Sequence, residues 1–210
     1  MRFFSLFSLF LTCSFFAKAA ETAKAVRVFP PDVVQGERTE KGSIEGNTPL
    51  IWAAWKGDLK TVHTLLMKEI EVDEENSVGK TALIWAAKMG HIDIVKALVK
   101  ERADLEGGNC PVIFHAIYHH RPEVVRVLLE MGSDINSQSN KGSRTPAIYA
   151  IECGSLECLR VLLLFSPNLK LKTKSGQTAL KVAKNLKATE KEWKEKKKEM
   201  IKLLKLAGAK

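Results

Sequence analysis

Apolar residues recur along this chain at the spacing of short amphipathic helices. One stripe consists of Leu59, Val62, Leu65 and Leu66, and another of Ile92, Val95, Leu98 and Val99. Residues three and four apart share one face of a helix, so each stripe predicts a helix with a single buried side. A shorter alanine-rich segment and a glycine precede each stripe, which predicts pairs of helices joined by tight turns.

The helix pair repeats at a nearly constant interval. Residues 46–73, GNTPLIWAAWKGDLKTVHTLLMKEIEVD, are closely matched by residues 79–107, GKTALIWAAKMGHIDIVKALVKERADLEG. The repeated units start at Thr48, Thr81, Pro111, Thr145 and Thr178, at intervals of 33, 30, 34 and 33 residues. Since one helix pair cannot bury its own apolar face, such a period predicts a solenoid of stacked copies. We delimit the repeats as residues 46–78, 79–108, 109–142, 143–175 and 176–210.

The residues at the predicted helix ends suit these roles. Thr48, Thr81, Thr145 and Thr178 can each cap the start of a first helix with the hydroxyl group. Gly57, Gly90 and Gly154 can end it, because glycine accepts the left-handed conformation. In the third repeat His120 replaces this glycine, and histidine tolerates a positive φ better than most residues do. The fifth repeat holds an insertion of about eight residues and predicts a lengthened final helix that caps the array.

The unit cores TPLIWAAWKGDLKTVHTLL, TALIWAAKMGHIDIVKALV and TPAIYAIECGSLECLRVLL resemble ankyrin repeats. The resemblance extends over residues 46–210, although it is weaker in the third repeat and partial in the fifth. It implies an all-α solenoid of stacked helix–turn–helix units with β-hairpin-like finger loops. It also implies a non-catalytic scaffold that binds another protein through the concave helix face and the finger tips.

The resemblance also indicates which residues would contact the partner protein, whose identity the sequence leaves open. The variable positions before each turn, together with two finger positions, are Trp55, Lys56, Lys88, Met89, Tyr118, His119, Glu152, Lys172 and Lys174. Exposed aromatic residues and methionine in a row would provide anchors for an interface. The alternative is that Trp55 and Tyr118 simply pack against the neighbouring unit. We expect the chain to be monomeric.

The N-terminal segment has a different character. Residues 1–19 combine Arg2, an apolar run over residues 3–16 and the small-residue ending Ala17-Lys18-Ala19, the layout of a secretory signal peptide. The run is shorter than the about 20 residues that span a bilayer, and an uncleaved membrane anchor is the alternative. Export would place the protein in the periplasm or outside the cell, and the short Phe-rich segment allows a bacterial source. Residues 20–45 lack the repeat pattern and predict a linker.

The positive charge is concentrated at the C-terminal end. The chain has a net charge of +9, which becomes 9 − 2 = +7 without Arg2 and Lys18. Residues 170–210 hold 14 lysines and 4 glutamates, a net of +10, so residues 20–169 carry 7 − 10 = −3. The lysines could form a solvated capping face, or they could contact an anionic membrane surface or another anionic partner. We expect no nucleic-acid partner, because no series of aromatic residues interleaves the lysines.

A metal site would have to use the histidines of the third repeat. His115 and His119 are four residues apart, which places them on one helix face at the spacing of metal ligands. However, His115 occupies the position held by Trp52, Trp85 and Tyr149 in the other repeats, which favours a packing role. No carboxylate or cysteine obviously completes the site, so we expect no bound metal and no cofactor.

Nucleophilic chemistry would have to use a cysteine. Without residues 1–19 the chain retains Cys110, Cys153 and Cys158, an odd number that does not suggest a disulfide framework. Cys158 aligns with Ile94 on the inward stripe and therefore favours core packing. The sequence contains no GxSxG motif, no glycine-rich phosphate loop and no marked carboxylate pair. We therefore expect no enzymatic activity, and a metal- or thiol-dependent enzyme is the least favoured alternative.

Overall fold

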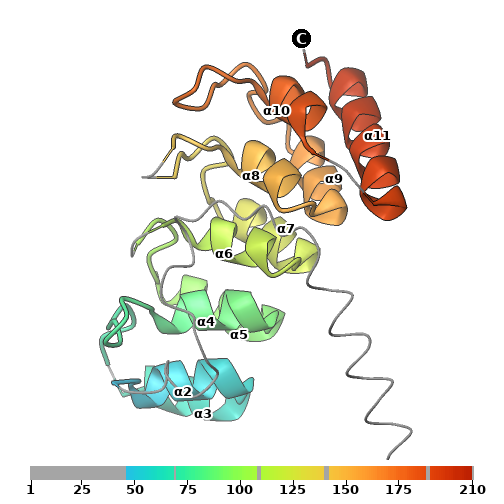
Figure 1. The fold of residues 1–210 in the computed structure, drawn as a ribbon. Coiled ribbons are helices and arrows are strands. Elements are labelled where there is room, and N and C mark those ends of the chain that lie inside the picture. Colours follow the sequence, from blue (N-terminus) through green and yellow to red (C-terminus); the bar gives the residue numbers. More distant parts are fainter. Residues whose placement is uncertain (1–45, 69, 108–109, 140–141, 188–189, 210) are drawn as a thin grey trace, which may run out of the picture.

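The structure, a computed structural model, describes residues 46–68, 70–107, 110–139, 142–187 and 190–209. These ranges form five helix pairs stacked along one axis (Figure 1). They contain no strand, and their β structure is an isolated antiparallel bridge between Lys172 and Thr178. The predicted all-α repeat solenoid is therefore confirmed. The predicted signal peptide, residues 1–19, and the predicted linker, residues 20–45, lie outside the described residues.

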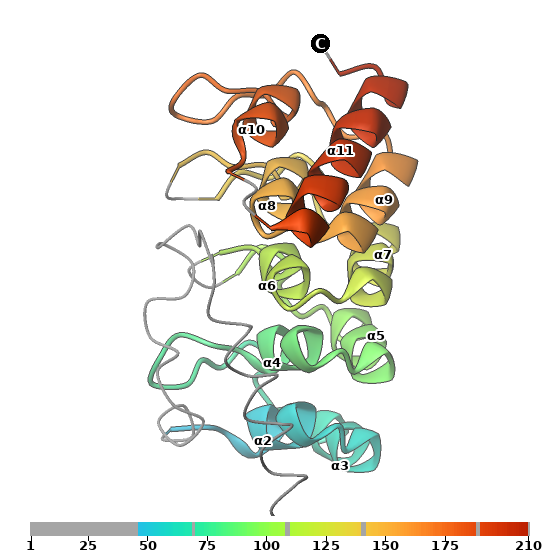
Figure 2. The same cartoon turned by 45° about the vertical axis from the view of Figure 1, so that its right-hand side comes forward.

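The helices form two layers. The first helices of the pairs are α2 (Pro49–Lys56), α4 (Ala82–Met89), α6 (Val112–Tyr118), α8 (Pro146–Glu152) and α10 (Ala179–Asn185). The second helices are α3 (Leu59–Leu66), α5 (Ile92–Lys100), α7 (Pro122–Glu130), α9 (Leu156–Leu164) and α11 (Lys191–Leu206). Each helix packs against its counterpart in the next repeat, so first helices form one layer and second helices the other (Figures 1 and 2). The loops that join consecutive repeats all project from the same side of the stack.

Threonine hydroxyl groups cap most of the first helices. The Oγ1 atoms of Thr48, Thr81 and Thr145 accept hydrogen bonds from backbone N–H groups three residues later, at 3.3, 3.3 and 3.4 Å. Such a bond satisfies one of the N–H groups that has no partner inside the helix. Thr178 is also the N-cap residue of α10, but its hydroxyl group makes no capping hydrogen bond. The capping prediction is therefore confirmed at three positions and wrong at Thr178.

Small and branched apolar side chains fill the space between the layers. The alanines in the middle of α2 and α4 are at most 4% exposed, which lets neighbouring first helices approach closely. In the second helices, the position five residues after the turn is fully buried in four consecutive repeats: Val62, Val95, Val125 and Leu159. The predicted inward stripe is therefore confirmed at its centre. Leu59, at the edge of the first stripe, is half-buried.

The turn of each of the first two repeats is covered by a side chain from the repeat that follows. Gly57 ends α2 with φ 79°, and the imidazole of His91 lies 2.6 Å from the position that a Cβ atom would take there. Gly90 ends α4 with φ 89°, and Arg121 approaches it in the same way, at 3.1 Å. Glycine is thus required twice over, by the left-handed backbone and by the close approach.

The remaining turns vary this arrangement. His120 has φ 53°, so the predicted left-handed residue is present without a glycine. The next repeat offers Ser155, a small residue, at the position equivalent to His91 and Arg121. At the turn after α8, a Cβ atom on Gly154 would overlap the ring of Trp193 in α11. Helix α11 therefore takes over the covering role at the end of the array.

The last helix differs from its counterparts in length. Helix α11 has 16 residues, whereas α9 has 9, and this confirms the lengthened final helix. Met200 and Leu204 are fully buried on its inner side, and Trp193 is half-buried. Among the helices that the structure describes, none combines the length and the apolar character needed to cross a bilayer.

Candidate partner-binding surface

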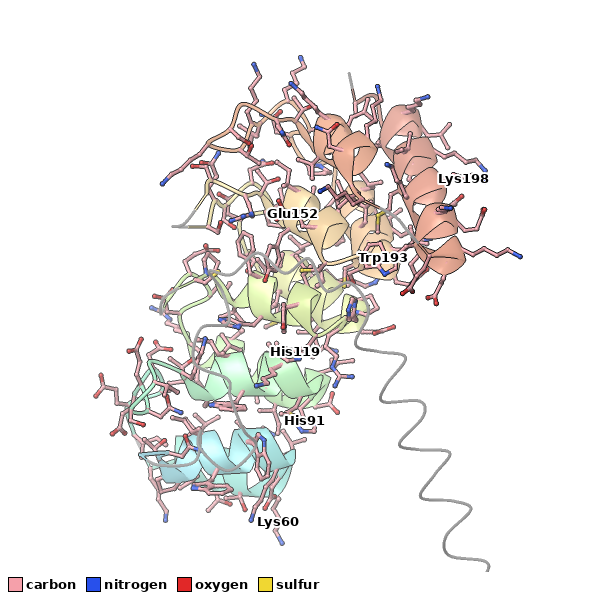
Figure 3. The ribbon with its side chains drawn as sticks, in the orientation of Figure 1. Lys60, His91, His119, Glu152, Trp193 and Lys198 are labelled. Atoms are coloured by element: carbon pink, nitrogen blue, oxygen red, sulfur yellow. The ribbon has the colours of Figure 1, made fainter. Side chains whose placement is uncertain are left out.

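The predicted contact residues before the turns lie at equivalent places in four consecutive repeats. Trp55 and Lys56 end α2, and Lys88 and Met89 end α4. The equivalent positions end α6 and α8: Tyr118, His119, Glu152 and Cys153. We call these eight residues the helix-end row; His119 and Glu152 are labelled in Figure 3. Lys56 is exposed and the other seven side chains are half-buried.

An aromatic pair holds the row at the first repeat. The rings of Trp55 and Trp52 lie edge to face, with centroids 5.4 Å apart and an interplanar angle of 81°. The ammonium group of Lys56 lies 5.4 Å from the centre of the Trp52 ring, close enough for a cation–π contact. Nε2 of His91 lies 3.2 Å from the backbone oxygen of Trp55, which ties this end of α2 to the second repeat.

Similar contacts hold the middle of the row. The Nζ atom of Lys88 lies 4.5 Å from the centre of the Trp85 ring, and Trp85 itself is buried. The rings of Tyr118 and His119 lie edge to face with centroids 5.0 Å apart. Nε of Arg121 donates a hydrogen bond of 3.1 Å to the backbone oxygen of Lys88. Cation–π and ring contacts therefore order these long side chains without burying them fully.

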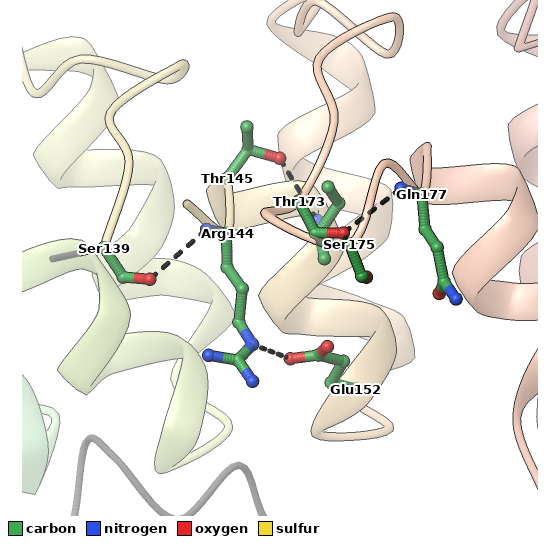
Figure 4. A network of polar contacts seen from close by, with 8 residues as sticks. Ser139, Arg144, Thr145, Glu152, Thr173, Ser175 and Gln177 are labelled. Atoms are coloured by element: carbon green, nitrogen blue, oxygen red, sulfur yellow. Dashed lines mark hydrogen bonds and ion pairs between the residues drawn. The ribbon is translucent and has the colours of Figure 1, made fainter. Parts of the chain in front are cut away.

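The row ends in an ion pair at the fourth repeat. Nε of Arg144 lies 2.7 Å from a carboxylate oxygen of Glu152, and both side chains are about four-fifths buried, at 19% and 20% exposed (Figure 4). Arg144 belongs to the finger loop before α8, and its backbone N–H donates to Oγ of Ser139 at 3.3 Å. The pair therefore connects the finger of the fourth repeat to the far end of its first helix.

The two predicted finger residues lie apart from the row. Lys172 and Lys174 are exposed in the loop between α9 and α10, where Lys172 forms the bridge with Thr178. The backbone N–H of Lys174 donates to the backbone oxygen of Gly142 in the previous finger, at 3.0 Å. The finger loops precede the first helices and the row ends them, so about 10 Å of helix separates the two groups. The predicted residues therefore form two separate groups on the array.

The structure places the candidate metal ligand His115 in the core. Its side chain is 4% exposed, and its Nε2 atom lies 3.2 Å from Nζ of Lys80. Burial first, and then the positive charge of Lys80, lower the pKa of His115 from 6.5 to about 3. The ring is therefore neutral at physiological pH. No cluster of three His, Cys, Asp or Glu residues able to hold a metal ion occurs in the described ranges.

The cysteines have the character of buried apolar residues. None of Cys110, Cys153 and Cys158 forms a disulfide, and among the three only Cys153 is more than marginally exposed. Burial raises the pKa of Cys153 to about 12 and that of Cys158 to about 11. Nucleophilic cysteines need a lowered pKa, so these two thiols have the opposite of the required property. The predicted packing role of Cys158 is confirmed by its complete burial.

Sequence reasoning missed two residues that support the row, Trp52 and Arg144. Trp52 lies three residues before Trp55 in one helix, a spacing that predicts contact and could have identified it. Arg144 was not identifiable from helical spacing, because a finger loop carries it and only the fold brings it to Glu152.

Comparison with known proteins agrees with the repeat architecture. A family model described as "Ankyrin repeats (3 copies)" matches residues 50–139 and again residues 113–204, so the two matches together span well over half of the chain. A stretch of 58 residues is 41% identical to the B-cell lymphoma 3 protein homolog of Mus musculus. It covers 28% of this chain and 13% of that protein, so the chain matches a small part of this curated relative.

Proposed function

Because this chain belongs to the ankyrin-repeat family, we propose that it is a non-catalytic scaffold that binds a partner protein through its helix-end row. Ankyrin repeats generally mediate protein–protein interaction, and the proteins built from them are typically not enzymes. A repeat array suits this function, because the stack buries a continuous core while the positions outside that core are free to vary.

The observation that carries the proposal is that Trp55, Met89 and Tyr118 lie within the last two positions of three consecutive first helices. Each side chain is half-buried, so packing already restricts its rotamers. When a partner contacts the remaining surface, these side chains therefore lose little further conformational entropy. Tryptophan and tyrosine are also enriched among the residues that dominate binding energy at protein interfaces.

The distribution of charge along the row favours one orientation of a bound partner. Lys56 is exposed beside Trp55 at the first repeat, whereas the carboxylate of Glu152 at the fourth is already paired with Arg144. A partner with an acidic group opposite Lys56 would be favoured in one orientation over the reverse. The finger lysines, Lys172 and Lys174, provide a second contact region for a partner large enough to reach around the first helices.

We also propose that the protein is exported, on the basis of the composition of residues 1–19. Cleavage after Ala19 would release a chain that begins at Ala20, in the periplasm or outside a bacterial cell. N-terminal sequencing of the protein recovered from the exported fraction tests this directly. A chain that still carries Met1 in that fraction would favour an uncleaved membrane anchor instead.

The scaffold proposal is tested by a crosslinking pulldown with the full chain, comparing the wild type with Trp55→Ala/Tyr118→Ala. Hot-spot residues cost about 2 kcal/mol or more when truncated, so each substitution should weaken binding by about thirtyfold. We expect a partner, identified by mass spectrometry, to be captured by the wild type and lost from the variant. Circular dichroism and thermal unfolding of both proteins verify that the fold is retained.

A matched control removes apolar surface away from the row. Met67 is 83% exposed and Leu164 is 69% exposed, and neither belongs to the helix-end row. The Met67→Ala/Leu164→Ala protein should retain the partner. The proposed surface would be contradicted if the Trp55→Ala/Tyr118→Ala protein still captured the partner and the Met67→Ala/Leu164→Ala protein did not. The absence of any captured protein would contradict the scaffold function itself.

A further inference from the structure

The final helix has two faces of opposite character. Trp193, Met200 and Leu204 lie on the side that packs against the array, with the last two fully buried. On the same side Lys197 is half-buried, and its Nζ atom donates a hydrogen bond of 2.7 Å to the backbone oxygen of Leu186. These contacts fix how α11 is rotated about its own axis.

The glutamates of α11 are all engaged in ion pairs. These pairs are Glu192–Lys196 at 2.7 Å, Glu195–Lys198 at 2.9 Å and Glu199–Arg160 at 2.9 Å. The last of them joins α11 to α9. Because the acidic side chains of the helix are matched in this way, the positive charge of its other lysines is not compensated within the helix.

Five exposed lysines share the outer face of α11. Lys191, Lys194, Lys198, Lys202 and Lys205 follow one another at intervals of 3, 4, 4 and 3 residues, and all five are exposed. This spacing places them on one narrow stripe about 21 Å long. In the part of the chain that the structure describes, Lys198 alone among them forms an ion pair. Lys198, labelled in Figure 3, points away from the stack, whereas Trp193 lies toward α9.

The surroundings of this lysine stripe extend its charge. Six more exposed lysines lie in the finger loop before α10, in α10 and just beyond it: Lys170, Lys172, Lys174, Lys181, Lys184 and Lys187. No acidic residue separates them in the chain between residues 170 and 187. The end of the solenoid therefore carries an excess of positive charge on α10, on α11 and on the finger loop before α10.

Two exposed leucines lie at the same end of the molecule as the last lysines. Trp193 packs on Gly154 and Glu199 pairs with Arg160, so α9 and α11 run side by side in the same direction. Their C-terminal ends therefore lie together, and these ends carry Leu164, 69% exposed, and Leu206, 76% exposed. Leu206 is four residues after Lys202, about 40° from it around the helix axis. The stripe is thus bordered by apolar side chains that face water.

We propose that the lysine stripe of α11 docks the protein on a lipid bilayer that carries anionic headgroups. Protein interfaces are depleted in lysine and enriched in arginine and aromatic residues, so a lysine-only face fits a shape-matched acidic protein poorly. Recognition of nucleic acid favours arginine forks and stacking aromatic rings, and the face offers neither. A fluid anionic surface needs only distributed positive charge, and exposed leucines beside that charge can enter the headgroup region.

This docking surface is independent of the helix-end row, which lies on α2, α4, α6 and α8. A protein partner on the row and a bilayer on α11 would be bound at different places on the array. Loss of membrane binding would therefore leave partner capture intact, and loss of partner capture would leave membrane binding intact.

The experiment is vesicle flotation with the full chain, at about 0.1 M and about 1 M salt, where the Debye length falls from about 10 Å to about 3 Å. Vesicles of phosphatidylcholine alone measure the binding that does not depend on lipid charge. Vesicles of phosphatidylcholine mixed with phosphatidylglycerol measure the total binding, and the difference between the two is the charge-dependent part. We expect the protein to float with the anionic vesicles at the lower salt concentration and to lose this charge-dependent binding at the higher one.

Substitution of the four stripe lysines without an ion pair tests the location. Near an anionic surface each lysine is worth about fivefold in the partition coefficient, so Lys191→Gln/Lys194→Gln/Lys202→Gln/Lys205→Gln should lower it by about a hundredfold or more. The matched control is Lys60→Gln/Lys68→Gln/Lys96→Gln/Lys100→Gln, which changes the net charge equally at four exposed positions of the first two repeats. The control should retain most of the binding.

Three results would overturn the proposal. One is equal binding to neutral and anionic vesicles. Another is an equal loss of binding in both quadruple variants, because net charge and not the stripe would then be responsible. The third is tighter binding to single-stranded RNA or to polyglutamate than to the anionic vesicles in the same buffer. The contribution of the leucines is tested separately. The Leu164→Ser/Leu206→Ser protein should bind anionic vesicles several-fold more weakly than the wild type, with an unchanged salt dependence. If this variant binds as tightly as the wild type, the leucines do not contact the bilayer.

Discussion

The buried histidine of the third repeat predicts a specific loss of stability in acid. His115 is 4% exposed, and Lys80, whose Nζ atom lies 3.2 Å from its ring, is itself positive. His119 and Lys88 add further positive charge around it. Each of these features opposes protonation of the ring, and no carboxylate contributes to its lowered pKa in the opposite direction. The unfolded chain, which lacks these surroundings, takes up the proton more readily.

The size of the effect follows from the two pKa values. In the folded protein the pKa of His115 is about 3, against the ordinary value of 6.5. As the pH falls below 6.5 the unfolded state binds the proton first, so the free energy of unfolding decreases until about pH 3 and is unaffected above 6.5. At about pH 5 the loss is about 1.5 pH units at 1.36 kcal/mol per unit, or about 2 kcal/mol. This is a large fraction of the stability of a small domain.

Urea unfolding followed by circular dichroism, at about pH 8 and about pH 5, measures this loss. The His115→Gln protein does not titrate at this position and keeps an acceptor for Lys80. Its stability should therefore fall by about 2 kcal/mol less than that of the wild type between the two pH values. His63→Gln, which removes an exposed histidine, should behave like the wild type. An equal decrease in the wild type and in His115→Gln would refute the reasoning.

Three further predictions concern the turns, caps and thiols. Gly154→Ala should destabilise the protein by about 2 kcal/mol more than Gly176→Ala in urea unfolding, because both glycines have a positive φ, 68° and 73°, but only the first is covered by the tryptophan ring of α11. Thr145→Ala should cost about 1 kcal/mol in the same assay, whereas Thr178→Ala should cost less because its hydroxyl group makes no capping bond. Cys153 should react slowly with iodoacetamide at neutral pH in the folded protein and rapidly in urea, as followed by mass spectrometry, because burial raises its pKa to about 12. Rapid reaction in the folded state would revive a thiol-dependent function.

Much of the architecture could be predicted because it depends on local periodicity. The stripes, the turn glycines and the left-handed His120 are all properties of residues close together in the chain, and the structure confirms them. The helix-end row could also be located, since it occupies the same two positions in each of four repeats. How deeply the side chains of the row are buried could not be predicted, because burial depends on which residues of the neighbouring repeats lie beside each side chain.

The unpredicted features connect residues that are far apart in the chain. Trp193 packs on Gly154 across an insertion that breaks the repeat period, so no alignment of units places the two together. The approach of Lys80 to His115, 35 residues away, likewise depends on how one repeat sits on the next. Such contacts depend on side-chain rotamers and on the angle between repeats, and a periodic pattern specifies neither of these.

The covering of each turn glycine has a consequence for how the protein is made. His91 covers Gly57, Arg121 covers Gly90, and Trp193 covers Gly154, so the covering group always comes from further along the chain. A ribosome synthesises the chain from its N-terminus, and the unit that has just emerged therefore lacks the side chain that completes its turn. Folding during translation should accordingly lag one unit behind synthesis, with the fourth unit completed only when α11 has left the exit tunnel.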